Sequence, residues 1–205
     1  MSGRRYGLVA ASLAATLALV LTGCGAAGPG PGDGPNLTSP TVAGGPVAPV
    51  APLAAANPTE LRIDSINASS NLVPLGLNAD QTVAVPPVST PMQAGWYRLG
   101  PTPGAPGPAV ILGHVNGDGH DGIFARLNQL KPGDQVKVSR ADGKTAVFTV
   151  TRMQQVAKSA FPTQAVYGDT ADAELRLVTC GGRFDSSKRS YVDSIVAFAT
   201  LTAVT

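Results

Sequence analysis

From about Asn57 onward, the chain is a series of short apolar runs that Gly, Pro and Asn interrupt at close spacing. Runs of this length suit β-strands, whereas a stable amphipathic helix needs a longer periodic segment. Many short strands separated by turn residues are typical of an all-β sandwich or barrel. The 205 residues include 24 glycines and 18 prolines, and only 14% of them are charged. This composition argues against helix bundles and coiled coils, and the length suits one domain with additional segments.

Eight segments have the pattern of a strand, and two of them are so apolar that we expect them to be buried. These two segments, residues 108–115 and 174–180, carry His114 and Cys180 at or near their ends. An Asp-Gly pair at residues 142–143 predicts a hairpin turn between two other strands. The predicted strands are residues 59–66, 82–85, 94–99, 108–115, 134–140, 145–153, 174–180 and 191–204, with short helices at 123–130 and 162–167.

The first 24 residues have the layout of an export signal. Two arginines precede an uncharged apolar run at residues 8–21, which is shorter than the ~20 residues that a membrane-spanning helix needs. The run ends in Leu-Thr-Gly-Cys at residues 21–24, which resembles the bacterial lipobox. We therefore predict a lipoprotein-type signal peptide over residues 1–24, with lipidation of Cys24 as the membrane anchor. A plain signal peptide or an uncleaved anchor is the alternative, and either one also places the domain outside the cytoplasm.

Residues 25–56 are rich in Gly, Pro, Ala and Val, and Asp33 is their only charge. Such a segment lacks a hydrophobic period and predicts an extended linker. The folded domain is then expected at residues 57–205. The net charge of +2 without a Lys/Arg cluster gives no electrostatic footprint for nucleic acid.

Cys180 is the residue whose presence most needs a chemical explanation. If Cys24 carries lipid, Cys180 is the one free thiol of an exported protein, which makes it a candidate nucleophile. An imidazolium such as that of His114 can activate a thiol and supply a proton to a leaving amine. Arg189, just before the last predicted strand, is the best placed oxyanion donor. The alternatives are a buried, inert cysteine and a structural histidine.

The run at residues 116–122 contains Asn, Asp and His side chains that could in principle bind calcium. It lacks a bidentate Glu, and Gly- and Asp-rich runs are mostly turns, so we assign this run and His120 to a turn. We expect no metal and no cofactor.

Several of these segments together resemble the sortases, and most closely the actinobacterial class F group. The strand with His114 comes first and the Leu-Val-Thr-Cys strand with Cys180 follows it, which is the order that this family shows. The resemblance runs from about Pro58 to Thr200. It rests on residues 95–97 (GWY), 100–104 (GPTPG), 108–115 (PAVILGHV), 177–182 (LVTCGG) and 191–193 (YVD).

The resemblance implies a closed eight-stranded β-barrel with short helices in its connections. It also implies a transpeptidase in which Cys180 attacks an LPXTG-like sorting signal and an amine, from a peptidoglycan precursor or another acceptor, or water resolves the thioester. His114 and an Arg would complete the catalytic set, and Thr179 and Trp96 would bind substrate. Trp96 is alternatively part of the core or of a groove wall.

The chain departs from the family pattern in two places. The family commonly has Tyr-Arg-Asp where this chain has Val192 between Tyr191 and Asp193, so the oxyanion donor is expected to be Arg189, or else Arg183. A lipobox also replaces the usual transmembrane anchor. These departures keep a second hypothesis open, a surface lipoprotein that uses the barrel for binding or scaffolding. An L,D-transpeptidase-like enzyme is the third, but its Ser-x-Gly-Cys context is absent.

Overall fold

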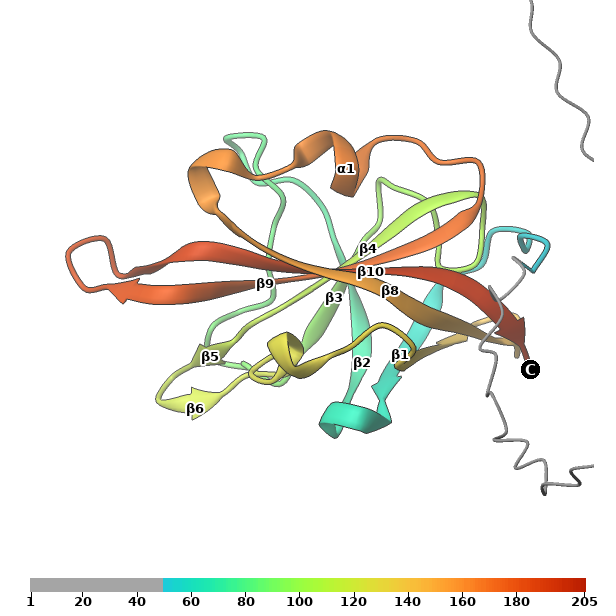
Figure 1. The fold of residues 1–205 in the computed structure, drawn as a ribbon, viewed down its shortest axis with the longest axis horizontal. Coiled ribbons are helices and arrows are strands. Elements are labelled where there is room, and N and C mark those ends of the chain that lie inside the picture. The colour runs from blue at the N-terminus through green and yellow to red at the C-terminus, as the bar shows by residue number, and fades with distance from the viewer. Residues whose placement is uncertain (1–49) are drawn as a thin grey trace, which may run out of the picture. The chain divides into compact units, whose positions relative to one another are not determined.

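The structure is a computed structural model that describes residues 50–205. The predicted signal peptide, Cys24 and the linker as far as residue 49 lie outside the described residues. Within the described part, eight strands close into one mixed β-barrel in the order β1-β2-β3-β4-β9-β10-β8-β7, which confirms the predicted fold class (Figure 1). No helix among residues 50–205 is long and apolar enough to cross a membrane. The barrel strands are β1 (Pro58–Ile63), β2 (Ala68–Leu75), β3 (Ala94–Tyr97), β4 (Gly107–Gly113), β7 (Gln135–Arg140), β8 (Thr145–Ala157), β9 (Ala173–Asp185) and β10 (Ser190–Val204).

The connections between the barrel strands contain only short elements. Strands β5 (Asn116–Gly117) and β6 (His120–Asp121) form a small separate hairpin after β4. The remaining elements are the 3-10 turns η1 (Asp64–Ile66), η2 (Leu127–Gln129) and η3 (Lys158–Ala160) and the helix α1 (Thr163–Tyr167).

Strands β4 and β9 are parallel neighbours in the barrel, and this pairing positions the site. Leu112 of β4 lies opposite Val178 of β9. Two residues further along each chain come His114 and Cys180, so both leave the pair at the same end. Two sequence segments that are far apart are therefore brought together by one strand pairing.

Side chains of β4 and β9 alternate between the barrel interior and its outer face, as expected for strands. Ile111 and Leu177 are fully buried in the interior, where each contributes about 1.5–3 kcal/mol by burial. Leu112 and Val178 lie on the outer face, where Val166 of α1 packs with them. By the same alternation Cys180 follows Val178 on the outer face, which is where a substrate can reach it.

The structure differs from the sequence predictions in two strands. Residues 82–85 form no ladder, and only a single bridge joins Leu77 and Val83. The missing barrel strand is β2, whose sequence ASSNLVPL has too few apolar residues to show a clear period. It forms because Asn67 adopts a left-handed conformation, with φ of 53°, and turns the chain back against β1.

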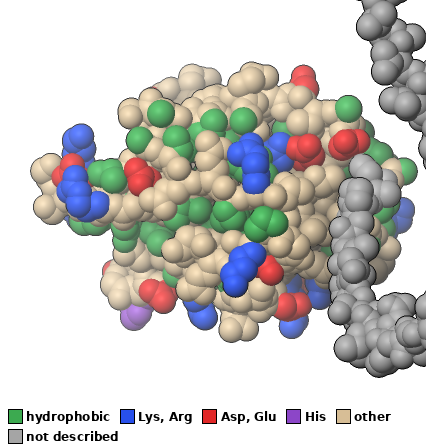
Figure 2. Space-filling model, in the orientation of Figure 1, with side chains coloured by type: hydrophobic (Ala, Val, Ile, Leu, Met, Phe, Trp, Pro, Cys, Tyr) green, Lys and Arg blue, Asp and Glu red, His purple; other side chains and the backbone are tan. Residues whose placement is uncertain are grey.

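The hairpin of β9 and β10 is longer than predicted on its β9 side. It continues past the barrel as a projecting ribbon, seen at the red end of the colour scale (Figure 1). Lys and Arg side chains gather at its outer end (Figure 2). This projecting part of the hairpin carries Arg189 near its turn.

Candidate active site

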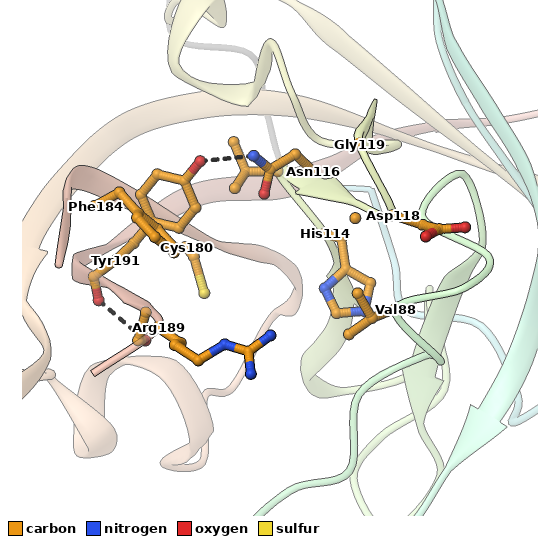
Figure 3. A pocket seen from close by; sticks show the side chains of 12 residues that line it. Val88, His114, Asn116, Asp118, Gly119, Cys180, Phe184, Arg189 and Tyr191 are labelled. Atoms are coloured by element: carbon orange, nitrogen blue, oxygen red, sulfur yellow. Dashed lines mark hydrogen bonds between the residues drawn. The ribbon is translucent and has the colours of Figure 1, made fainter. Parts of the chain in front are cut away.

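A pocket of about 340 Å³ opens where the pairing of β4 with β9 ends. Its lining includes all three residues that the sequence predicts to be catalytic: His114, Cys180 and Arg189 (Figure 3). The three come from the segment after β4, from β9 and from the β9–β10 turn, respectively. The fold therefore brings together a thiol, an imidazole and a guanidinium from three separate segments.

Cys180 is half-buried and is the free cysteine of the described residues. It pairs with Ser194 of β10, and just beyond this pair the register of β9 and β10 shifts between Tyr191 and Asp193. Val192 lies within this irregularity and lines a different pocket, together with Arg183. A bulge of this kind redirects the side chains around it, and Val192 is not among the residues that line the pocket of Cys180.

His114 is half-buried, and the backbone around it is tightly packed. Its carbonyl oxygen accepts a hydrogen bond from the Phe124 amide at 3.0 Å. A Cβ added to Gly122 would collide with that same carbonyl group, so only glycine fits there. The imidazole Nε2 lies 2.6 Å from the carbonyl oxygen of Pro86. The backbone of His114 is thus held by its contacts with Gly122 and Phe124, and its ring by the contact with Pro86.

Arg189 has a left-handed backbone with φ of 48°, which is uncommon for a residue with a side chain. Strain of this type costs about 1–2 kcal/mol and persists only where the surroundings impose it. The turn before it is held by Asp185, whose carboxylate accepts hydrogen bonds from the Ser187 hydroxyl and from the Ser187 and Lys188 amides. These bonds, the Ser187 hydroxyl foremost, lower the pKa of Asp185. The guanidinium of Arg189 extends across the pocket between Cys180 and His114 (Figure 3).

One side-chain hydrogen bond joins the two walls of the pocket. The Asn116 amide donates to the Tyr191 hydroxyl at 2.8 Å (Figure 3). The Tyr191 ring also makes an edge contact with Phe184, with ring centroids 5.2 Å apart. Asn116 belongs to the segment that follows His114, and Tyr191 to the strand that follows Arg189, so this bond links the two sides of the site.

The two predicted substrate-binding residues do not line this pocket. Trp96 is a core residue with 7% exposure, and its indole lies near the Pro101 carbonyl. Thr179 is 5% exposed, and its hydroxyl has no hydrogen-bond partner among the described residues. Their roles toward a substrate stay predictions.

Sequence reasoning missed several residues of the pocket wall. Tyr191 and Asn116 stand in segments that were singled out, but nothing in the sequence showed that they face each other. Phe184 and Val88 are half or more exposed, and a solitary exposed apolar residue carries no sequence signal. Pro86 does not line the pocket and contacts His114 through its backbone carbonyl, which every residue type offers.

The run at residues 116–122 forms the small β5–β6 hairpin, as the assignment to a turn predicted. Asp118 and Gly119 adopt positive φ angles of 49° and 77° at its tip. Within residues 50–205, no group of three or more His, Cys, Asp or Glu side chains is arranged to hold a metal ion.

Solved structures with this barrel include several sortases. Sortase A of Listeria monocytogenes superposes with a TM-score of 0.54 at 18% identity, over 74% of this chain and 90% of that one. The SrtA sortase of Actinomyces oris gives 0.53 at 21% identity, over 78% and 88%. Sortase C-1 of the same species gives 0.56 at 19% identity, over 71% and 73%. At these identities the likeness concerns the fold.

The sequence itself identifies the family. None of the curated protein sequences matches the chain. The model of the sortase domain, in contrast, matches residues 61–202, which is nearly the whole barrel. The chain therefore belongs to the sortase family of cysteine transpeptidases, which act at the outer side of the cell membrane.

Proposed function

We propose that this protein is a class F-like sortase that cleaves an LPXTG-like sorting signal and transfers the acyl part to an amine of the cell wall or to water. The observation that carries the proposal is that Cys180, His114 and Arg189 line one pocket. These are the nucleophile, the proton carrier and the oxyanion donor that acyl transfer through a thioester needs.

In the first half-reaction the Cys180 thiolate attacks the carbonyl carbon of the scissile peptide bond. The guanidinium of Arg189 donates hydrogen bonds to the oxyanion of the tetrahedral intermediate. The C–N bond then breaks, the leaving amine takes a proton from the His114 imidazolium, and a thioester remains on Cys180.

In the second half-reaction an acceptor amine attacks the thioester carbonyl. His114 removes a proton from this amine, and Arg189 again stabilises the oxyanion. The C–S bond breaks, which returns Cys180 to the thiolate and His114 to the imidazolium. Water in place of the amine gives hydrolysis by the same steps.

A second pocket, of about 480 Å³, supports an extended peptide as the substrate. It lies over the outer face of β4, and its lining includes Val110, Leu99 and the edge-to-face pair of Tyr97 and Tyr167. Burial raises the pKa of Tyr167, with a smaller contribution from Tyr97. Val110 precedes His114 by four positions, which is ~13 Å along a strand. An extended peptide covers a similar length with four residues, so an apolar side chain four positions from the cleaved bond suits this pocket.

The proposal is tested with a fluorogenic LPXTG-type peptide and the full chain purified from membranes. We expect a burst of leaving group and a thioester on Cys180, detected by mass spectrometry of the intact protein. Cys180→Ala should abolish both while its melting temperature stays within a few degrees of the parent, because only one sulfur is removed. Residual cleavage by pure Cys180→Ala would assign the chemistry to another residue. Peptide binding without any thioester in the parent would favour the binding-module hypothesis.

We also propose that the enzyme is held at the membrane by lipid on Cys24. The support is the Leu-Thr-Gly-Cys sequence at the end of the apolar run. Mass spectrometry of the mature N-terminus should show an acylated Cys24, and Cys24→Ser should release the protein from the membrane fraction or leave its signal uncleaved. An unmodified thiol at Cys24 would contradict the proposal.

A further inference from the structure

We propose that the Pro86 carbonyl fixes the protonation geometry of His114, so that Nδ1 alone exchanges protons with the reacting groups. This inference rests on the proposed function of His114 as the proton carrier. It assigns Pro86 as a positioning residue for the catalytic histidine. The two residues are distant in sequence and meet only through a side chain-to-backbone contact.

The contact between the two groups has one chemical interpretation. The imidazole Nε2 of His114 lies 2.6 Å from the Pro86 carbonyl oxygen. A carbonyl oxygen only accepts hydrogen bonds, so Nε2 must carry the proton in this arrangement. In a neutral imidazole one nitrogen carries the proton and the other offers a lone pair. Nδ1 is then the nitrogen with the free lone pair.

The Pro86 carbonyl is held by its own surroundings and does not depend on His114 for its position. Pro86 is buried, and both Pro86 and Pro87 have backbones that their rings restrict. The next turn is closed by the Thr90 amide, which donates to the Pro87 carbonyl at 3.0 Å. Gly117 of the β5–β6 hairpin also packs against the Val88 carbonyl so closely that a Cβ would lie 2.5 Å from it.

The orientation of the ring agrees with this assignment. In Figure 3 one nitrogen of the imidazole is turned toward the part of the pocket that contains Cys180 and Arg189. Because Nε2 is the nitrogen at Pro86, the one that faces the thiol side is Nδ1. A half-turn of the ring would place a C–H group against the Pro86 carbonyl and leave that oxygen without its partner.

The consequence is that both proton transfers of the cycle pass through one atom. Nδ1 gives its proton to the leaving amine and takes one from the acceptor, while the Nε2–H bond to Pro86 stays in place. A hydrogen bond from the ring nitrogen that stays outside the chemistry is a common way to select the tautomer of a functional histidine. Here the acceptor of that hydrogen bond is a backbone carbonyl of a Pro-Pro segment, in place of a carboxylate or amide side chain.

The tautomer can be measured without any catalysis, by nitrogen-15 NMR of the imidazole. The full-length Cys180→Ala chain is labelled at histidine, and its spectrum is followed towards high pH until the imidazole nitrogen signals no longer change. His120→Gln in the same background removes the other histidine signal, because His114 and His120 are the two histidines of the chain. We expect a protonated Nε2 and an unprotonated Nδ1 for His114. A proton on Nδ1, or a mixture of the two tautomers, would overturn the inference even if the enzyme is an active sortase.

A second experiment separates positioning from simple stability. Pro87→Gly keeps the Pro86 carbonyl but frees the peptide that follows it, and Pro87 is exposed, so the fold should tolerate the change. We expect about a tenfold lower kcat with little change in KM, and NMR signals of both tautomers. Pro87→Ala should have a kcat between those of the parent and Pro87→Gly, because alanine restricts the backbone more than glycine does. Pro132→Gly, also exposed and remote from the pocket, is the control and should change neither quantity. A loss of kcat in Pro87→Gly with the His114 tautomer unchanged would show that the segment acts by another route.

Discussion

His114 and Arg189 face the same pocket, but the structures that hold them are of different kinds. The His114 segment is packed against the barrel core through Ile123 and Phe124, and glycines allow its backbone to lie in close contact. Arg189 sits on a hairpin that projects past the barrel, where Phe184 is 50% exposed. His114 is thus held by the packed domain, whereas Arg189 is held by the turn of the hairpin and by the hydrogen bond between Asn116 and Tyr191. We therefore expect substitutions near His114 to lower mainly the stability of the fold, and substitutions on the Arg189 hairpin to lower mainly the reaction rate.

The largest effect is expected from Gly122→Ala on the His114 side. The added Cβ would collide with the His114 carbonyl group. This carbonyl cannot move away without losing the hydrogen bond that it accepts from the Phe124 amide. We expect a loss of more than about 3 kcal/mol of unfolding free energy, measured by urea denaturation, and little remaining activity.

Gly119→Ala on the same loop is the matched control for that change. A Cβ at Gly119 has open space around it, although the φ of 77° remains unfavourable for alanine. Its cost should be about 1–2 kcal/mol. Equal losses in the two variants would mean that the loop is not as tightly held as the packing indicates.

The next effect is expected from Arg189→Ala on the hairpin side. If Arg189 is the oxyanion donor as proposed, its loss should slow acylation by about 100-fold. The melting temperature should stay near that of the parent, because the side chain makes no ion pair within the described residues. Arg189→Lys should recover little, since a lysine lacks the planar fork. Arg183 lines the other pocket, so Arg183→Ala should be mild. Stopped-flow measurement of leaving-group release compares the three variants.

A smaller effect is expected where the two sides are joined. Tyr191→Phe removes the hydrogen bond to Asn116 and keeps the ring contact with Phe184. We expect about a fivefold fall in kcat, equivalent to ~1 kcal/mol for one hydrogen bond. Asn116→Ala should give a similar loss, and the double variant should be little worse than either single one. Fully additive losses would show that the two side chains act independently.

The smallest effect is expected from Thr179→Val. Thr179 is buried with an unpartnered hydroxyl, and valine has nearly the same shape without it. Thermal melting should show a gain of up to ~1 kcal/mol, with KM unchanged. A higher KM for the peptide would instead support the predicted role of Thr179 in substrate binding.

Much of the fold could be predicted from the sequence because strand pattern and turn residues are local. The strands next to His114 and Cys180 were predicted in the right places, since each is a continuous apolar run, although β4 ends at Gly113 and β9 continues to Asp185. The strand Ala68–Leu75 was missed because its place in the barrel depends on pairing with β1 and β3, which no local pattern shows. The prediction of a strand at residues 82–85 was wrong for the opposite reason: the segment is rich in β-branched residues, but only a single bridge joins it to another segment.

The site was predictable where chemistry requires a particular side chain and unpredictable where geometry decides. Cys180 and His114 stood out by residue type. Arg189 could be named as a candidate, but its left-handed backbone and the bulge that contains Val192 are visible only in three dimensions. Pro86 could not be named at all, because a backbone carbonyl leaves no mark in the residue type.

The parallel pairing of β4 and β9 also determines when His114 reaches Cys180 during folding. Parallel neighbours cannot be joined by a tight turn, and everything from Gly113 to Ala173 must be accommodated before the two strands meet. Contacts between such distant segments form late, because closing the long loop between them costs conformational entropy before the contacts are gained. Before that moment Cys180 has no His114 imidazole beside it, although Arg189 is already close to it on the same hairpin. If His114 activates the thiol as proposed, this activation has to wait until β4 and β9 have paired.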